Sequence, residues 1–320
     1  MFWNDKPYYS LNYYYKEKFN TKVYKLALNG GMTCPNRDGL IDTRGCIFCS
    51  AGGSGEFTPS RLLPVSEQLK EAKKLVAHKN PDGKYIAYFQ AYTNTYAPVA
   101  YLRRIYYEAL SDPDVVGISI ATRPDCISDE VYKLLSEMCQ KTVVYVELGL
   151  QTIHEDTAAF IRRGYSLDVF DSAVARLKNL GVNVVAHMII GLPGEDKSMI
   201  LDTAAHLAKC RVDGVKLQLL HILKNTDLAL VYEKEHFHIL SLKEYCDIIV
   251  SVIENLPPDI VIHRLTGDGK RDMLIEPLWS LDKKNVLNTI LKTFREREAY
   301  QGKMLTERRA SWILPPYTNL

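Results

Sequence analysis

Strand-like and helix-like segments alternate through most of this 320-residue chain. Apolar runs rich in β-branched and aromatic residues predict strands at 23–28, 85–91, 115–121, 143–150, 182–190, 215–220 and 260–263. Apolar residues at helical spacing predict helices at 65–78, 98–111, 129–140, 167–180, 197–208 and 241–255. Such alternation is typical of parallel strands joined by crossover helices. Six or seven units are too few for a closed eight-stranded barrel, so we expect an open, partial βα barrel of the α/β class.

The two ends fall outside this pattern, which divides the chain into residues 1–22, 23–276 and 277–320. The N-terminal segment holds five tyrosines between Tyr8 and Tyr15. We expect them to pack under a loop, with stacking on RNA bases as the alternative. The C-terminal segment is expected to form one helix, 282–298. A basic tail then carries Lys303, Arg308, Arg309 and Trp312. Either end could cover an open barrel edge.

Composition excludes several classes of protein. The formal net charge is only +2, so no global basic field demands nucleic acid. No apolar run approaches the length of a membrane span, and the first residues lack a secretory signal, so we expect no membrane partner. Seven cysteines favour reduced thiols in the cytoplasm over a disulfide framework. Four of them lie in or beside apolar periodic stretches and are expected to be buried: Cys126, Cys139, Cys210 and Cys246.

The other three cysteines, Cys34, Cys46 and Cys49, follow the first predicted strand with C-x11-C-x2-C spacing. A structural zinc site or an electron-transfer [4Fe–4S] cluster normally has four protein ligands. A cluster held by three thiolates leaves one iron with an open position for a substrate or cofactor. From the cysteines alone, a zinc knuckle completed by a distant histidine remains an alternative.

A three-cysteine loop at the top of a partial barrel resembles the radical S-adenosylmethionine (SAM) superfamily. The commonest family spacing is C-x3-C-x2-C. The ending Cys46-Ile-Phe48-Cys49 matches its terminal part, whereas the first spacing of eleven residues departs from it and resembles the branch of the Elongator catalytic subunit. The resemblance implies that Cys34, Cys46 and Cys49 bind a [4Fe–4S] cluster and that its open iron chelates SAM. It also implies a flavodoxin or ferredoxin as the electron donor.

Further likenesses follow the second and fourth strands. The family usually has a glycine-rich segment after the second strand that holds the SAM amine; here Thr93 and Asn94 offer polar groups in its place. Residues 146–152, followed by Arg162-Arg163-Gly164, resemble the oxygen-independent coproporphyrinogen dehydrogenase branch. That resemblance implies that Arg163 binds the methionine carboxylate of SAM and that Gln151 or Glu147 binds its ribose. A satisfied carboxylate in the barrel interior is the alternative for Glu147.

Later strands add candidate residues. The fifth strand ends in the run from His187 through Gly191 to Glu195, which resembles the glycine-rich adenine-contacting motif of the superfamily, with His187 at a ribose-contacting position. On the sixth strand, Lys216 is expected to bind a substrate carboxylate or phosphate, or else to form an internal salt bridge with Glu147. Arg264 follows the last strand, where it would meet a substrate at the barrel mouth.

Taken over residues 20–270, the sequence is most similar to bacterial proteins of this length that are related to the Elongator catalytic subunit but lack its acetyltransferase domain. This resemblance implies an enzyme of tRNA wobble uridine modification, converting a carboxymethylaminomethyl to an aminomethyl group. Basic residues near the C-terminus could contact tRNA phosphates or form a solvated helix face: Lys283, Lys284, Lys292, Arg295 and Arg297. Two alternatives are a radical SAM enzyme acting on a small metabolite or tetrapyrrole, and a non-catalytic zinc-binding RNA module.

Overall fold

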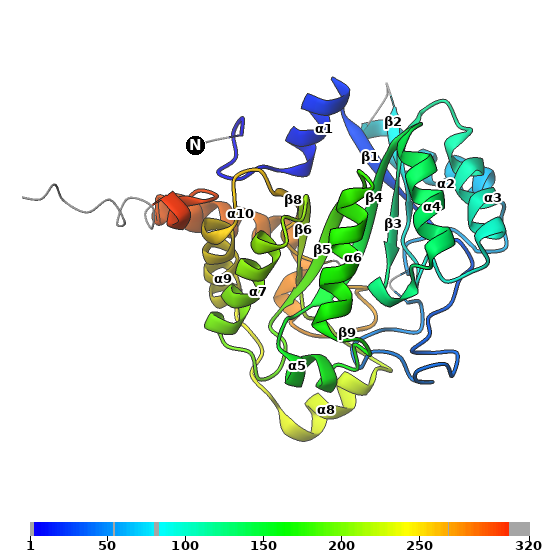
Figure 1. The fold of residues 1–320 in the computed structure, drawn as a ribbon. Coiled ribbons are helices and arrows are strands. Elements are labelled where there is room, and N and C mark those ends of the chain that lie inside the picture. Colours follow the sequence, from blue (N-terminus) through cyan, green and yellow to red (C-terminus); the bar gives the residue numbers. More distant parts are fainter. Residues whose placement is uncertain (1–2, 54, 80–82, 268, 307–320) are drawn as a thin grey trace, which may run out of the picture.

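Seven parallel strands form one curled sheet in the order β1-β2-β3-β4-β5-β6-β8 (Figure 1). The computed structural model describes residues 3–53, 55–79, 83–267 and 269–306. The strands are β1 (Val23–Leu28), β2 (Lys84–Phe89), β3 (Val115–Thr122), β4 (Val143–Gln151), β5 (Asn183–Ile190), β6 (Gly214–Leu219) and β8 (Val261–Arg264). Each overlaps its predicted run, and the open half-barrel is confirmed. A separate antiparallel pair, β7 (Ile222–Leu223) and β9 (Leu274–Glu276), was not predicted.

The predicted crossover helices cover the outer face of the sheet (Figure 1). They are α2 (Val65–Val76), α3 (Val99–Leu110), α4 (Asp129–Cys139), α6 (Leu167–Asn179), α7 (Lys197–Lys209) and α9 (Leu242–Asn255). The C-terminal helix α10 (Lys283–Glu296) is also confirmed, and it packs against α9. Three helices were not predicted: α1 (Leu11–Phe19), α5 (Glu155–Phe160) and α8 (Asp227–Glu235).

The alternation of side chains along the strands separates an apolar outer layer from a polar interior. On β4, Val144, Val146 and Leu148 are buried in the core formed with the outer helices. Tyr145 and Glu147 alternate with them and therefore point to the concave side of the sheet. The inside of the half-barrel is thus available for polar chemistry, while the helix-facing side supplies the hydrophobic stabilisation.

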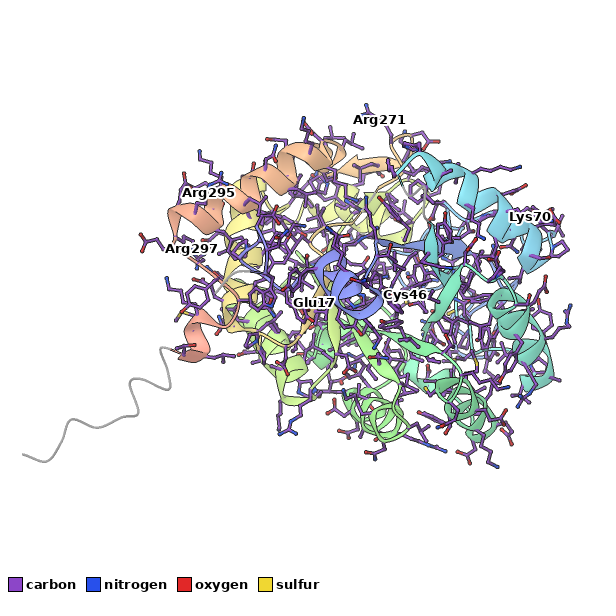
Figure 2. The ribbon with its side chains drawn as sticks, turned by 90° about the horizontal axis from the view of Figure 1, so that it is seen from above. Glu17, Cys46, Lys70, Arg271, Arg295 and Arg297 are labelled. Carbon is purple, nitrogen blue, oxygen red and sulfur yellow. The ribbon has the colours of Figure 1, made fainter. Side chains whose placement is uncertain are left out.

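The N-terminal segment covers the open edge between β1 and β8. Ser10 forms a parallel bridge to Ile262, whose backbone N–H donates to the Tyr9 carbonyl at 2.8 Å. The ring of Tyr15 is buried and lies edge-on to Tyr145 of β4. Seen from above, α1 with Glu17 lies over the middle of the ring of helices (Figure 2). The expected packing role of the tyrosines is therefore confirmed for Tyr8 and Tyr15, which are buried.

Two expectations about individual side chains need correction. Of the four cysteines expected to be buried, Cys246 is buried, but Cys126, Cys139 and Cys210 are partly exposed because they lie at or near the ends of their elements. In the basic tail, Arg308, Arg309 and Trp312 lie outside the described residues. No helix in the described part of the chain combines the length and the apolar character that a membrane crossing requires.

Gln301 joins the N-terminal segment to the end of the sheet. Its side chain is buried, accepts from Tyr9 N at 2.8 Å and donates to Pro257 O at 2.6 Å and Ile260 O at 2.8 Å. We expect Gln301→Ala to lower the free energy of unfolding by about 3 kcal/mol, because three backbone groups, one of them in a fully buried residue and two partly buried, lose their partner. Urea unfolding followed by circular dichroism measures this change. Lys292→Ala, at a side chain that is 67% exposed, should stay within about 0.5 kcal/mol of the parent chain; equal effects would contradict the prediction.

Candidate active site

A cavity of about 730 Å³ connects the loop after β1 with the interior of the half-barrel. Its lining includes most of the residues singled out from the sequence: Cys34, Cys46, Cys49, Thr93, Glu147, Gln151, Arg163, His187, Lys216 and Arg264. Two others, Asn94 and Gly191, do not line it. The strands therefore bring together side chains that are up to 230 positions apart in the sequence, as expected for the carboxyl ends of a parallel sheet.

The cysteine loop, residues 29–53, has no regular secondary structure, and two polar side chains hold it in place. Asn36 is buried and donates to Arg162 O at 2.7 Å and to Cys46 Sγ at 3.4 Å. Arg37 donates to Cys49 O at 2.8 Å and to Ser50 O at 2.7 Å. Sequence reasoning missed both residues, although they stand two and three positions after Cys34.

The three thiols fit an iron–sulfur cluster better than a single zinc ion. Their sulfur atoms do not all lie within 4.8 Å of one another, whereas thiolates on one tetrahedral zinc are roughly 3.8 Å apart. Burial raises the pKa of Cys46 to about 12 and raises that of Cys49 too, so bound metal is needed to hold them as thiolates at neutral pH. The Asn36 N–H that points at Cys46 is the kind of donor that tunes a cluster.

A buried ionic network spans five strands inside the half-barrel. The fully buried carboxylate of Glu147 accepts from Lys25 Nζ at 2.5 Å, Ser119 Oγ at 2.6 Å and His187 Nε2 at 2.7 Å, and it also pairs with Lys216. We call these five residues the interior network. The internal Lys216–Glu147 salt bridge, left open by the sequence, is therefore present. Glu147 is a satisfied carboxylate as well as a cavity residue.

The network sets the charge of its members. Burial alone would raise the pKa of Glu147, but Lys216, Lys25 and His187 hold it well below its usual range. Burial lowers the pKa of Lys216 to about 7 even though Glu147 opposes this, so Lys216 can exchange a proton near neutral pH. Burial also lowers the pKa of His187. Because Gln218 donates to His187 Nδ1 at 3.2 Å, the neutral ring carries its proton on Nε2, facing Glu147.

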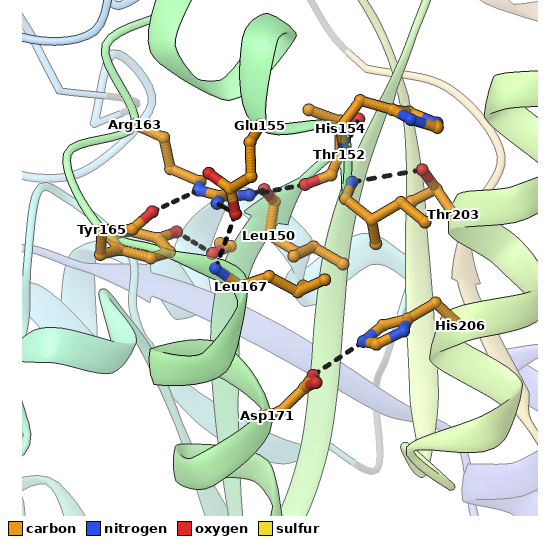
Figure 3. A network of polar contacts seen from close by, with 12 residues as sticks. Leu150, Thr152, His154, Glu155, Arg163, Tyr165, Leu167, Asp171, Thr203 and His206 are labelled. Atoms are coloured by element: carbon orange, nitrogen blue, oxygen red, sulfur yellow. Dashed lines mark hydrogen bonds and ion pairs between the residues drawn. The ribbon is translucent and has the colours of Figure 1, made fainter.

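Gln151 and Arg163 both line the cavity, but they differ in how many hydrogen bonds the protein makes to them. Gln151 has a left-handed backbone, with φ of 69°, and its buried Oε1 has no partner among the described residues. Arg163 donates to Thr152 O at 2.6 Å and Tyr165 O at 2.9 Å and pairs with Glu155 at 2.9 Å (Figure 3). Arg163 therefore braces the turn after β4. Its predicted contact with a carboxylate of SAM stays a prediction, while the orphaned oxygen of Gln151 is ready for a ligand donor.

Asn94 and Gly191 have roles within the protein. The Asn94 side chain donates to Phe89 O at 3.1 Å and to Ala121 O at 2.9 Å, so it ties the loop after β2 to β3. Gly191 has φ of 92°, and a Cβ there would lie 3.2 Å from the Leu240 side chain. Thr93, next to Asn94, does line the cavity. Direct contacts of Asn94 and Gly191 with SAM remain predictions.

The cavity is strongly biased toward positive charge. Nine of its lining residues are Lys or Arg, and the single acidic one is Glu147. Sequence reasoning missed Lys25, an inward-facing lysine on β1 in the run Val-Tyr-Lys-Leu-Ala-Leu. The near-neutral charge of the whole chain hides this local bias, which favours an anionic ligand.

Removing the carboxylate of Glu147 should destabilise the fold in a pH-dependent way. We expect Glu147→Gln to lower the free energy of unfolding by about 3 kcal/mol at pH 7, because Lys25 and Lys216 lose their buried counter-ion. The pKa of Glu147 is lower in the folded than in the unfolded chain, so its contribution is present above about pH 4.5 and is lost as pH falls further. The difference between the two proteins should shrink accordingly in acid urea titrations. Glu71→Gln, at an exposed position on α2, is the control, and a pH-independent difference would contradict the prediction.

Comparisons with known proteins agree with this geometry. The Radical SAM superfamily model matches residues 43–207, starting after Cys34, and the Radical_SAM C-terminal domain model matches residues 212–296. Protein YtqA of Bacillus subtilis is 46% identical, with 93% of each chain covered. Elongator complex protein 3 of Danio rerio is 27% identical over 51% of this chain and 30% of its own length.

A solved structure shares the fold. The archaeal Elp3 of Methanocaldococcus infernus, with residues 1–46 deleted, superposes with a TM-score of 0.67 at 17% identity. The alignment covers 87% of this chain but 64% of the archaeal one, so the chain spans less than two thirds of that protein. The superfamily match extends over half of the chain, and it agrees with the half-barrel and the three-cysteine loop. The chain belongs to the radical SAM superfamily, whose members use a [4Fe–4S] cluster and S-adenosylmethionine.

Proposed function

We propose that this radical SAM enzyme acts on tRNA and converts a carboxymethylaminomethyl group on the wobble uridine to an aminomethyl group. The observation that favours an anionic substrate is the composition of the cavity lining, which has nine basic residues and one acidic residue. The similarity to Elongator complex protein 3 supports tRNA as that substrate. A small anionic metabolite or a tetrapyrrole would need the basic interior but no basic surface outside it.

The proposed chemistry divides between the two ends of the cavity. Cys34, Cys46 and Cys49 would hold the cluster, and Gln151 and Thr93 offer polar atoms to SAM beside it. When bound, the cluster and SAM supply reductive cleavage of SAM and removal of a hydrogen atom from the substrate. An external flavodoxin or ferredoxin would deliver the electron. The surroundings of Cys46 and Cys49 desolvate both thiols and raise their pKa values.

The interior network would receive the modified base. Lys216 and Lys25 face the cavity from β6 and β1, where they can bind the substrate carboxylate, and Lys216 can also hold or release a proton near neutral pH. The attacked carbon would be the methylene between the amine and that carboxylate. Loss of one hydrogen atom and one electron from it, with SAM as the net oxidant, would leave an imine, and hydrolysis by water would break the carbon–nitrogen bond to give the aminomethyl product and glyoxylate. His187 and Glu147 would keep the two lysine side chains in position. Arg264, at the end of β8, lines the same cavity and is proposed to meet the substrate.

We assign contact with tRNA to only part of the basic C-terminal helix. Lys283, at the start of α10, lines the cavity. Lys292 pairs with Glu296 on the same helix, and Arg297 pairs with Asp247 and Glu254 of α9. Arg295 and Arg297 lie at the outer rim of the molecule in Figure 2. Because Lys283 lines the cavity, we assign phosphate contact to that end of the helix, and we assign a structural role to Arg297, which is ion-paired with α9.

Cleavage of SAM tests the first part of the proposal. Anaerobically reconstituted protein with dithionite should produce 5′-deoxyadenosine and show the broad visible absorption of an iron–sulfur cluster. Cys46→Ala should abolish both, because two thiolates cannot hold the cluster. Cys139→Ser, a partly exposed cysteine on α4 away from the cavity, is the matched control and should retain both. Colourless protein that binds zinc and leaves SAM intact would overturn the enzyme assignment.

Binding of tRNA tests the second part. We expect Lys283→Gln to weaken tRNA binding and to reduce the slope of log affinity against log salt by about one, because one phosphate contact is lost. Lys292→Gln makes the same charge change nine residues along α10, about two and a half turns away and outside the cavity lining, and should leave the slope unchanged. Product nucleosides are then measured by mass spectrometry with tRNA and with the free modified nucleoside as substrates. Equal slopes for both variants, or faster turnover of the free nucleoside, would favour the small-molecule alternative.

A further inference from the structure

Three side chains with metal-ligating atoms meet between two outer helices, away from the cavity. Asp171 belongs to α6, His206 to α7, and Cys210 caps the C-terminal end of α7. Figure 3 shows Asp171 and His206 pointing toward one another across the space between the helices. Among the described residues, this is the one group of three such side chains whose ligand atoms all lie within 4.8 Å of each other.

The distances within the group are close to those around a tetrahedral zinc ion. His206 Nε2 lies 2.7 Å from Asp171 Oδ1, and Cys210 Sγ lies 3.4 Å from each of these atoms. Bond lengths of ~2.05 Å to nitrogen and oxygen and ~2.3 Å to sulfur place tetrahedral ligands roughly 3.3 Å apart for N and O, and about 3.6 Å apart for S and N. Opening the group around a cation would therefore separate His206 Nε2 from Asp171 Oδ1 by about 0.6 Å more and move Cys210 Sγ outward by about 0.2 Å.

The local sequence explains why the ligands converge. His206 and Cys210 are four residues apart, which places them on one face of α7. Helices α6 and α7 precede and follow β5, so they lie next to each other on the outside of the sheet, and Asp171 of α6 faces that pair. The donor set of one thiolate, one imidazole and one carboxylate is borderline in softness and suits zinc rather than magnesium or calcium.

Solvent can reach this group of side chains. The side chain of Asp171 is 38% exposed and that of His206 is 16% exposed, so an ion can enter from solvent and keep a water ligand. Burial and the Asp171 charge raise the pKa of Cys210 to about 12. Without a cation the thiol thus keeps its proton beside the carboxylate, and a divalent ion would replace that proton and neutralise the group.

We propose that Asp171, His206 and Cys210 bind one divalent cation of the zinc class, with water as the fourth ligand. The ion would tie α6 to α7 across β5, the strand that carries His187 into the cavity. A hydrogen-bonded contact of His206 with Asp171 that holds no metal is the competing explanation. This proposal does not depend on the substrate of the enzyme.

The test uses the full-length holoenzyme with its cluster reconstituted, so that the cysteine loop is already occupied. Zinc is titrated in, and absorption at the zinc K-edge reports its ligands without interference from iron. We expect one zinc per chain, with a single sulfur at ~2.3 Å and nitrogen or oxygen neighbours at ~2.0–2.1 Å. Cys210→Ser should remove the sulfur neighbour, whereas the control Cys139→Ser should retain it.

A second variant controls for effects that arise from loss of folding. Asp171→Asn keeps an acceptor for His206 and removes the charge, so circular dichroism should be unchanged. Loss of a hydrogen-bond partner of a metal ligand weakens metal binding by up to roughly 100-fold. Cys210→Ser removes a ligand itself and should weaken zinc binding by more than that. Asp171→Asn should reduce the rise in melting temperature that zinc produces. Zinc affinity that is the same in the parent and both variants would overturn the proposal. So would a zinc spectrum with three sulfur neighbours, or a parent holoenzyme that binds no zinc.

Discussion

The buried carboxylate of Glu147 is the constraint on which the interior of this half-barrel depends. It joins Lys25, Ser119, His187 and Lys216 from four other strands at one level of the sheet. An ionised group without partners would be very costly in this position, so each neighbour is needed to keep the carboxylate charged. Apolar residues of similar volume could stabilise a barrel as well or better. Stability therefore does not explain the network, whereas a need for two positioned lysines in the cavity does.

Closure of the sheet edge depends on a different part of the chain. Seven strands leave a gap between β1 and β8, and an unpaired edge exposes backbone donors and acceptors. The N-terminal segment supplies Tyr9 and Ser10 to this edge, and Gln301 holds that segment from the C-terminal side. Residues 9–10 and Gln301 thus meet at the open edge of the barrel. Lys6 and Lys283 line the cavity there, which places basic side chains from both ends near its mouth.

The sequence predicts those parts of the molecule that short-range patterns determine. Strands and crossover helices follow from periodicity, and the inward position of Lys216 follows from alternation along its strand, whereas Glu147 and His187 are identified through the family resemblance. The same alternation places Lys25 on the inner face of β1. That Lys25 pairs with Glu147 can be recognised only once β1 and β4 are known to face the same interior. Helices α1, α5 and α8 are nine residues or fewer and gain their stability from contacts across the chain, as in the pairing of Arg162 near α5 with Asp227 of α8. Arg163 shows the opposite limit: the motif locates it correctly, but the backbone carbonyls that its guanidinium binds are invisible in the sequence.

The long spacing between the first two cysteines is explained by the path of the loop between them. Backbone N–H groups of Ile41 and Gly45 donate to Pro35 O at 2.9 Å and Asn36 O at 2.6 Å, so the intervening chain folds back on itself. Gly45 has φ of 80°, and a Cβ there would lie 2.8 Å from Arg37 Nε, which makes glycine necessary at the point of return.

Because the chain leaves Cys34 and returns beside Asn36, the residues between the first two cysteines form a loop whose ends lie close together. Asp42 on this loop approaches Arg162 at 3.7 Å, and Arg44 approaches Asp227 at 3.5 Å, so it docks beside α5 and α8. An eleven-residue spacing can thus present its thiols to one cavity as a three-residue spacing does elsewhere in the superfamily. The inserted residues also explain why Asn36 and Arg37, rather than regular secondary structure, hold the cysteine loop against the barrel.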